Sequence, residues 1–140
     1  MVDKPNPDET TGEDSEAEKS PQILIVDDQP EIHTALEYLL ADHHFIVTMQ
    51  SDGGAGVRWA RVNKPDVILL DIDMPVMDGI KTLHLLRNFS ETRKIPVLML
   101  TARNDQKSVE RAASLGIEGY VTKPYDLMNV MGRIQQILKK

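Results

Sequence analysis

The chain has 140 residues, 41% of them hydrophobic and 27% charged, a composition typical of one soluble globular domain. It has no cysteine, which excludes disulfides and thiolate metal sites and fits a reducing compartment such as the cytoplasm. The net charge is −6, but residues 1–20 hold seven acids and two lysines. The rest of the chain is therefore nearly neutral and lacks the basic pattern of nucleic-acid-binding proteins.

Residues 1–20 are predicted to form a disordered acidic arm or linker ahead of a single domain at 21–140. The segment is highly charged, contains the structural breakers Pro5, Pro7 and Gly12, and has almost no apolar side chains. It cannot bury enough surface to offset the entropy of ordering; a specific docking segment is the alternative interpretation. No apolar run in the chain is long enough to span a membrane, and the acidic start is unlike a signal peptide.

From residue 21 onward, short apolar runs alternate with segments whose apolar residues recur at helical spacing. Continuous apolar runs that end in polar residues are typical of strands buried on both faces of a parallel sheet. Their strict alternation with helices predicts right-handed crossovers and a doubly wound α/β fold. The expected strands cover 23–26, 45–49, 67–71, 96–101 and 119–122, and the expected helices cover 30–42, 52–63, 79–89, 104–115 and 126–140.

Polar side chains stand where the predicted strands end, namely Asp27 and Asp28, Asp71, Thr101 and Lys123. The carboxyl ends of parallel strands share one edge, where such sheets bind ligands, so these side chains should converge. Three carboxylates and one ammonium leave an excess of negative charge that favours a bound cation, and oxygen ligands without His or Cys favour Mg²⁺. A carboxylate nucleophile, Mg²⁺ and a lysine are the parts needed for phosphoryl transfer to an aspartate.

Four motifs carry a resemblance to a known family. In chain order they are Ile25-Val26-Asp27-Asp28, the run LLDIDMPVMDG from Leu69 to Gly79, Thr101-Ala102, and the run GYVTKPY from Gly119 to Tyr125. Together they make residues 21–140 resemble the receiver domain of two-component response regulators, similar to the chemotaxis receivers. The resemblance implies a flavodoxin-like fold of five helices and a five-stranded parallel sheet in the order 2-1-3-4-5.

The resemblance implies a role for each acid at this edge. Asp71 would accept a phosphoryl group from the phosphohistidine of a sensor histidine kinase or phosphotransfer protein. Asp28 would bind Mg²⁺ directly and Asp27 through water, together with Asp71 and the backbone carbonyl of Asp73. The protein would then be a signalling switch that catalyses only its own phosphorylation and slow dephosphorylation, in the cytoplasm and with no direct contact to nucleic acid or membrane.

The resemblance also assigns the groups that respond to the phosphoryl group. Lys123, placed by a cis peptide bond to Pro124, and the amide of Ala102 would contact the phosphoryl oxygens. Thr101 would move toward the same oxygens and vacate space into which Tyr120 rotates. The face built from the fourth helix, fifth strand and fifth helix would change shape and bind a downstream protein, an output domain or a second copy of the chain. The alternative for Tyr120 is a static, packed aromatic.

Asp73 and Arg103 each lie two residues beyond a predicted site residue. We hypothesise that they face each other across the mouth of the site and influence how readily water or a phosphodonor enters. Two unrelated solvated side chains are the alternative.

Other interpretations of the same residues stay open. Each aspartate could be only a helix cap. Asp71-Ile72-Asp73 also resembles the Asp-x-Asp signature of haloacid-dehalogenase-type phosphohydrolases, although here it lies on the third strand and no segment is long enough for a cap domain. A receiver used as a phosphorylation-independent interaction module is a further alternative, and the chain could act alone or be one domain of a longer protein.

Two groups of residues outside the motifs receive simpler interpretations. Asp78-Gly79 is expected to serve turn geometry only. The histidines share no ligand spacing and are interpreted as surface or helix residues; they are His33, His43, His44 and His84.

Overall fold

A five-stranded parallel sheet forms the centre of the protein in the computed structural model, which describes residues 20–139. The strand order is β2-β1-β3-β4-β5, so the predicted order and fold class are confirmed. The acidic arm predicted at 1–20 lies outside the described residues except for Ser20. The strands are β1 (Gln22–Val26), β2 (Ile46–Gln50), β3 (Val67–Leu70), β4 (Val97–Thr101) and β5 (Gly119–Thr122).

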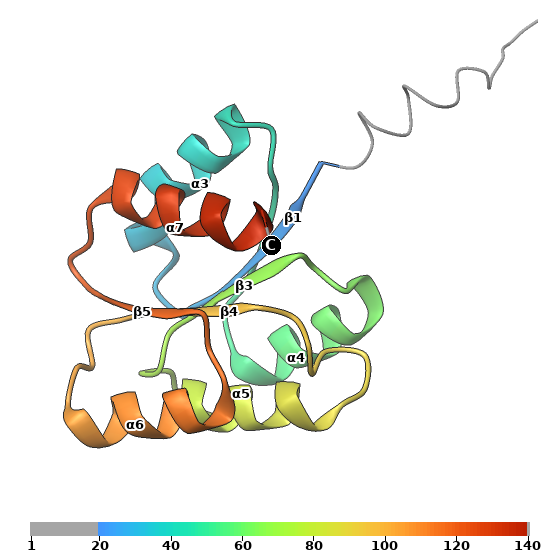
Figure 1. Ribbon diagram of the computed structural model, residues 1–140, viewed down its shortest axis with the longest axis vertical. Helices are drawn as coiled ribbons and strands as arrows, with labels where there is room; N and C mark the ends of the chain where they lie inside the picture. Colours follow the sequence, from blue (N-terminus) through green and yellow to red (C-terminus); the bar gives the residue numbers. More distant parts are fainter. Residues whose placement is uncertain (1–19, 140) are drawn as a thin grey trace, which may run out of the picture.

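Helices cover both faces of the sheet, as Figure 1 shows: α3 and α7 lie on one side, and α4, α5 and α6 on the other. The first expected helix begins instead as a 3₁₀ turn, η1 (Pro30–His33), a common geometry at the start of a helix, and its N-cap residue Gln29 makes no side-chain cap hydrogen bond. None of the helices within residues 20–139 has both the length and the apolar character needed to cross a membrane. The α-helices are α3 (Thr34–Asp42), α4 (Gly53–Asn63), α5 (Gly79–Asn88), α6 (Gln106–Leu115) and α7 (Leu127–Lys139).

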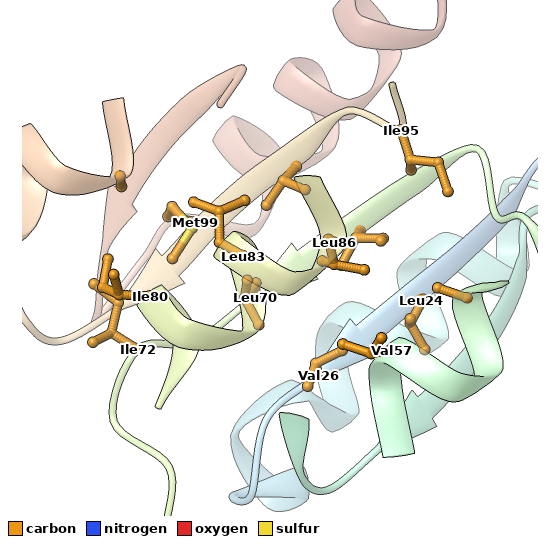
Figure 2. Packing of buried hydrophobic residues seen from close by; sticks show 14 of the residues in the cluster. Leu24, Val26, Val57, Leu70, Ile72, Ile80, Leu83, Leu86, Ile95 and Met99 are labelled. Atoms are coloured by element: carbon orange, nitrogen blue, oxygen red, sulfur yellow. The ribbon is translucent and has the colours of Figure 1, made fainter. Parts of the chain in front are cut away.

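The central strands are buried on both faces, which explains their continuous apolar sequences. Along β1, Leu24 and Val26 face the α4–α6 side, whereas Ile23 and Ile25 face the α3–α7 side. Figure 2 shows the first of these clusters, in which Val57 of α4 lies beside Leu24 and Val26, and the side chains of α5 lie against β3 and β4. The two hydrophobic clusters pack against both faces of the sheet and so fix the positions of the residues that directly follow its strands.

Helix α4 contains glycines that lower its intrinsic helix propensity, and close packing explains them. A Cβ atom on Gly53 would lie 2.1 Å from Oγ1 of Thr82, and one on Gly56 would lie 2.8 Å from Cγ2 of Val26. The helix therefore approaches α5 and β1 more closely than any larger residue would allow. Trp59 of the same helix packs partly buried against this core.

Candidate functional site

Three acids from two strand ends meet at the carboxyl edge of the sheet. Val26 pairs with Leu70 across β1 and β3, so Asp27 and Asp71 leave the sheet side by side. The backbone N–H of Asp71 donates to the carbonyl of Val26 at 3.1 Å. One carboxylate oxygen from each of Asp27, Asp28 and Asp71 lies within 4.8 Å of the other two. Topology alone thus brings together acids that are more than 40 residues apart in the sequence.

Lys123 supplies the positive charge of this cluster. The end of β5 is fixed by a backbone hydrogen bond from Lys123 N–H to the carbonyl of Thr101, at 2.8 Å, and the peptide bond to Pro124 is cis. The ammonium Nζ lies 2.6 Å from Oδ2 of Asp27 and 3.4 Å from Oδ2 of Asp71. The ammonium of Lys123 is therefore held mainly by Asp27 and lies within reach of an oxygen of Asp71.

The two buried aspartates have opposite pKa shifts. Burial would raise the pKa of Asp27, but hydrogen bonds from His33, Lys123 and the backbone of Gln29 outweigh it and lower the value. Burial raises the pKa of Asp71, the charge of Asp27 raises it further, and the opposing effects of Thr101 and Lys123 are too small to reverse this. Of these two acids, Asp71 is thus the one whose negative charge is less compensated.

The hydroxyl of Thr101 connects Asp71 to the loop after β4. This buried oxygen accepts from the backbone N–H groups of Arg103, at 3.2 Å, and Ile72, at 3.4 Å, and its hydrogen bond with Asp71 lowers the pKa of that acid. Tyr120 on β5 donates its hydroxyl proton to the carbonyl of Arg103, and burial raises its pKa. Thr101 and Tyr120 thus contact the same short loop, which begins with the exposed Ala102.

Asp73 and Arg103 form an ion pair next to this cluster. Nε and Nη2 of Arg103 donate to Oδ1 of Asp73 at 2.9 and 2.6 Å, and both side chains are about half exposed. The backbone N–H of Asp73 also donates to Oδ1 of Asp71, at 3.3 Å. The pair therefore joins the loops that follow β3 and β4 beside the buried acid.

The buried histidine His33 contacts the acidic cluster through Asp27, and the sequence interpretation did not single it out. His43, His44 and His84 are exposed, but His33 is 1% exposed, with Nε2 2.6 Å from Oδ2 of Asp27 and Nδ1 3.1 Å from the hydroxyl of Tyr125. Burial, aided by the charge of Asp27, raises the pKa of Tyr125 to about 12. The spacing of His33 with Leu36 and Leu40, at three and seven residues, was the available signal that it faces the core.

Gly79 does more than complete a turn. A Cβ atom at this position would lie 2.0 Å from the carbonyl oxygen of Asp71, so the start of α5 rests directly on the backbone of that residue. The preceding Asp78 caps α5, its Oδ1 accepting from the N–H of Lys81 at 2.9 Å. Both residues therefore help to fix the backbone of Asp71.

The donor set fits a hard divalent cation. It offers clustered carboxylate oxygens, with no thiolate, and the imidazole of His33 is already bonded to Asp27. Both oxygens of Asp27 accept hydrogen bonds, since Oδ1 also receives the N–H of Gln29 at 2.8 Å. In the described part of the chain, by contrast, the carboxylate of Asp28 receives no hydrogen bond. Asp28 thus has oxygens available for direct coordination.

Comparison with known proteins gives a consistent result at the levels of family, sequence and structure. A family model described as "Response regulator receiver domain" matches residues 23–135. The chain is 36% identical over 119 residues to the alkaline phosphatase synthesis transcriptional regulatory protein PhoP of Bacillus subtilis, covering 85% of this chain and 49% of PhoP. It is 34% identical over 121 residues to the transcriptional regulatory protein PrrA of Mycobacterium tuberculosis, covering 86% of this chain and 51% of PrrA. The chain therefore spans about half the length of the curated relatives it matches.

Among solved structures, the receiver domain of the sensor histidine kinase PA1611 from Pseudomonas aeruginosa is 30% identical, with a TM-score of 0.78. The match covers 86% of this chain and 99% of that domain, which was crystallised with a magnesium ion coordinated in its active-site cleft. A putative response regulator from Chloroflexus aurantiacus is 28% identical with a TM-score of 0.81, covering 87% of this chain and all of that one.

Proposed function

The chain belongs to the response regulator receiver domains of two-component systems, and on this basis we propose that Asp71 is its phosphoacceptor. Domains of this family are signalling switches rather than turnover enzymes. The observation that carries the proposal is the convergence of Asp71 with Asp27, Asp28 and Lys123 at the carboxyl edge of the sheet. Of the two buried acids, Asp71 also has the less compensated charge, as its raised pKa indicates.

In the proposed reaction, a carboxylate oxygen of Asp71 attacks the phosphorus of a phosphohistidine on a sensor histidine kinase or phosphotransfer protein. The P–N bond breaks, its electron pair stays on the donor imidazole, and a mixed anhydride forms on Asp71. Nζ of Lys123, 3.4 Å from Oδ2 of Asp71, is close enough to contact the incoming phosphoryl oxygens as a point charge. The amide of Ala102 and the hydroxyl of Thr101 would contact the same oxygens.

Asp28, Asp27, Asp71 and the backbone carbonyl of Asp73 are the groups that would hold Mg²⁺. The ion, when bound, would offset the excess negative charge of the acids and of the phosphoryl group. The clustered oxygens of the three acids and the absence of competing soft ligands among them support this assignment. Slow hydrolysis of the acyl phosphate would then return the protein to its resting state.

The switching element would consist of Thr101 and Tyr120. Movement of the Thr101 hydroxyl toward the phosphoryl group would release the loop that holds the hydroxyl of Tyr120 at the carbonyl of Arg103. The surface of α6, β5 and α7 would change in consequence and bind a downstream protein, an output domain or a second copy of the chain. We propose the cytoplasm as the location, because phosphohistidine donors of this type act there.

Asp73 and Arg103 would control access to the acyl phosphate. Their ion pair, with N–O distances of 2.6 and 2.9 Å, joins the loops on two sides of Asp71. We expect Asp73→Asn and Arg103→Ala to change the lifetime of the acyl phosphate severalfold, measured by loss of phosphoprotein after removal of the donor. Arg93→Ala, at an exposed position away from the site, is the control. Unchanged lifetimes in both site variants would show that the pair has no such role.

A turnover assay separates the receiver from a phosphohydrolase. In the hydrolase alternative Asp73 would be the general acid, but here its carboxylate is held by Arg103. We expect a small phosphodonor such as acetyl phosphate to give one equivalent of acid-stable, base-labile phosphoprotein, only with Mg²⁺. Multiple turnovers on phosphate monoesters would support the hydrolase instead. A chain that takes up no phosphoryl group would indicate a phosphorylation-independent interaction module.

A further inference from the structure

We propose that His33 and Tyr125 are positioning residues that orient Asp27 for cation binding. The inference rests on the proposed function, because it assigns Asp27 to the Mg²⁺ site. His33 lies outside the four motifs that carry the family resemblance, Tyr125 is the last residue of the fourth motif, and neither side chain is expected to touch the phosphoryl group. Their contacts nevertheless lead directly to one of the acids.

The donors and acceptors in this network can be assigned outward from the carboxylate of Asp27. Oδ2 of Asp27 lies 2.6 Å from the ammonium of Lys123, so the carboxylate is ionised and only accepts hydrogen bonds. Nε2 of His33, 2.6 Å from the same oxygen, must therefore carry the proton that it donates. In a neutral imidazole Nδ1 is then an acceptor, and the hydroxyl of Tyr125 donates to it at 3.1 Å.

These contacts fix the plane of the Asp27 carboxylate from several directions. Oδ2 receives His33 from η1 and Lys123 from the end of β5, while Oδ1 receives the N–H of Gln29 from the loop between β1 and η1. The side chains of Asp27 and His33 are each 1% exposed, so water cannot replace a lost donor at low cost. Without His33, we expect the carboxylate to be free to rotate away from the position set by Lys123.

Tyr125 connects the network to the loop that carries Lys123. The ring of Tyr125 stacks on His33, with 6.1 Å between ring centroids and 15° between planes. Since Tyr125 follows Lys123 by two residues, the β5–α7 loop reaches Asp27 twice: directly through Lys123 and indirectly through Tyr125 and His33. His33 thus helps to hold the β5–α7 loop, which carries Lys123, in a fixed position beside Asp27.

Hydrogen bonds to metal-binding carboxylates usually contribute to metal affinity, and removing them costs about 10–100-fold. Titration of the protein with MgCl₂ by isothermal calorimetry tests the proposal without any phosphodonor. We expect His33→Leu to weaken Mg²⁺ binding about tenfold or more, and Tyr125→Phe, which keeps the ring but loses the hydroxyl, to weaken it severalfold. His33→Gln can still donate an N–H to Asp27, so it should restore most of the affinity.

The control is His84→Leu, which removes an exposed histidine and should bind Mg²⁺ as the unmodified protein does. A folded His33→Leu variant with unchanged Mg²⁺ affinity would overturn the proposal. So would a His33→Gln variant as weak as His33→Leu, because packing rather than the hydrogen bond would then be responsible. If His33→Leu does not fold, unchanged affinity in Tyr125→Phe overturns it.

The same titration distinguishes failure of this inference from failure of the proposed function. If the unmodified protein binds Mg²⁺ and is phosphorylated while the His33 and Tyr125 variants bind equally well, only the positioning role is wrong. If the unmodified protein neither binds Mg²⁺ nor takes up a phosphoryl group, the proposed function itself is wrong.

Discussion

Two cationic side chains, Arg87 and Lys123, lie at opposite edges of the sheet and have very different surroundings. Near the amino edge, the half-buried guanidinium of Arg87 donates to the carbonyl of Gly116 at 2.8 and 3.2 Å, and to that of Ile95 at 3.0 Å. It also donates to the carbonyls of Thr92 and Arg93. At the carboxyl edge, the ammonium of Lys123 is shared between two carboxylates, with a third close by.

The difference separates a stabilising site from the site proposed to bind Mg²⁺ and the phosphoryl group. Around Arg87, neutral carbonyls satisfy the cation without adding a competing charge, and they join the loops that precede β4 and β5. Around Lys123, carboxylates outnumber the ammonium, so the folded protein keeps an excess of negative charge that a cation could offset. We therefore expect substitutions at the amino edge to reduce stability and some substitutions at the carboxyl edge to increase it.

The largest effect should come from Arg87→Ala. The substitution leaves four carbonyls without their charged donor, and hydrogen bonds to charged groups each contribute about 1.5–3 kcal/mol. We expect the free energy of unfolding, measured by urea denaturation, to fall by about 3 kcal/mol. Arg93→Ala is the matched control and should change it by less than about 0.5 kcal/mol. If Arg87→Ala and Arg93→Ala lower the free energy of unfolding equally, the carbonyl contacts of Arg87 do not stabilise the amino edge as we expect.

A smaller effect of opposite sign is expected for Asp71→Asn. Burial and the charge of Asp27 raise the pKa of Asp71, so ionising this acid at neutral pH costs stability that the neutral amide does not lose. In Mg²⁺-free buffer at pH 7 the variant should be more stable by on the order of 1 kcal/mol.

The pH dependence of this gain follows from the direction of the pKa shift. Because the pKa of Asp71 in the folded protein lies above the ordinary aspartate value of 3.8, the cost is fully present above the folded pKa and disappears as the pH falls below 3.8. The two proteins should therefore approach equal stability on acidification. Asp42→Asn, at an exposed acid in α3, should show no comparable gain. A less stable Asp71→Asn protein at neutral pH would mean that the acid is well compensated after all.

The smallest effect should come from Val76→Asn at the same edge. Val76 is fully exposed and has a φ angle of 70°, a left-handed conformation that β-branched residues rarely adopt but asparagine tolerates. We expect the variant to be stabilised by less than about 1 kcal/mol in thermal or urea unfolding, a smaller gain than for Asp71→Asn. Val62→Asn is the control, because it replaces an exposed valine inside α4. It should not stabilise the protein, which would show that the gain at Val76 comes from the backbone conformation.

Much of the fold was predictable from the sequence because its strands are buried on both faces. Such strands appear as short apolar runs, and their alternation with helices nearly determines the parallel topology. The convergence of Asp27, Asp71 and Lys123 followed from the same topology, since each residue ends or follows a strand. Their roles also needed the family resemblance.

The remaining features depend on tertiary geometry that leaves little trace in the sequence. The contact of His33 with Asp27 arises where a 3₁₀ turn replaces the expected first turn of a helix. The carbonyls around Arg87 belong to two separate loops, and only the folded chain brings them together. Val76 occupies a left-handed position where glycine or asparagine would have been the recognisable signal, so the sequence gives no indication of it.

Mapping the phosphorylated residue tests the central claim most directly. The unmodified protein, Asp71→Asn and Asp73→Asn would each be incubated with acetyl phosphate and Mg²⁺, then analysed by intact-mass and peptide mass spectrometry. We predict one phosphoryl group on Asp71 in the unmodified protein and in Asp73→Asn, none in Asp71→Asn, and none in any sample when Mg²⁺ is chelated. A phosphoryl group that persists in Asp71→Asn, or that maps to another residue of the unmodified protein, would contradict the account.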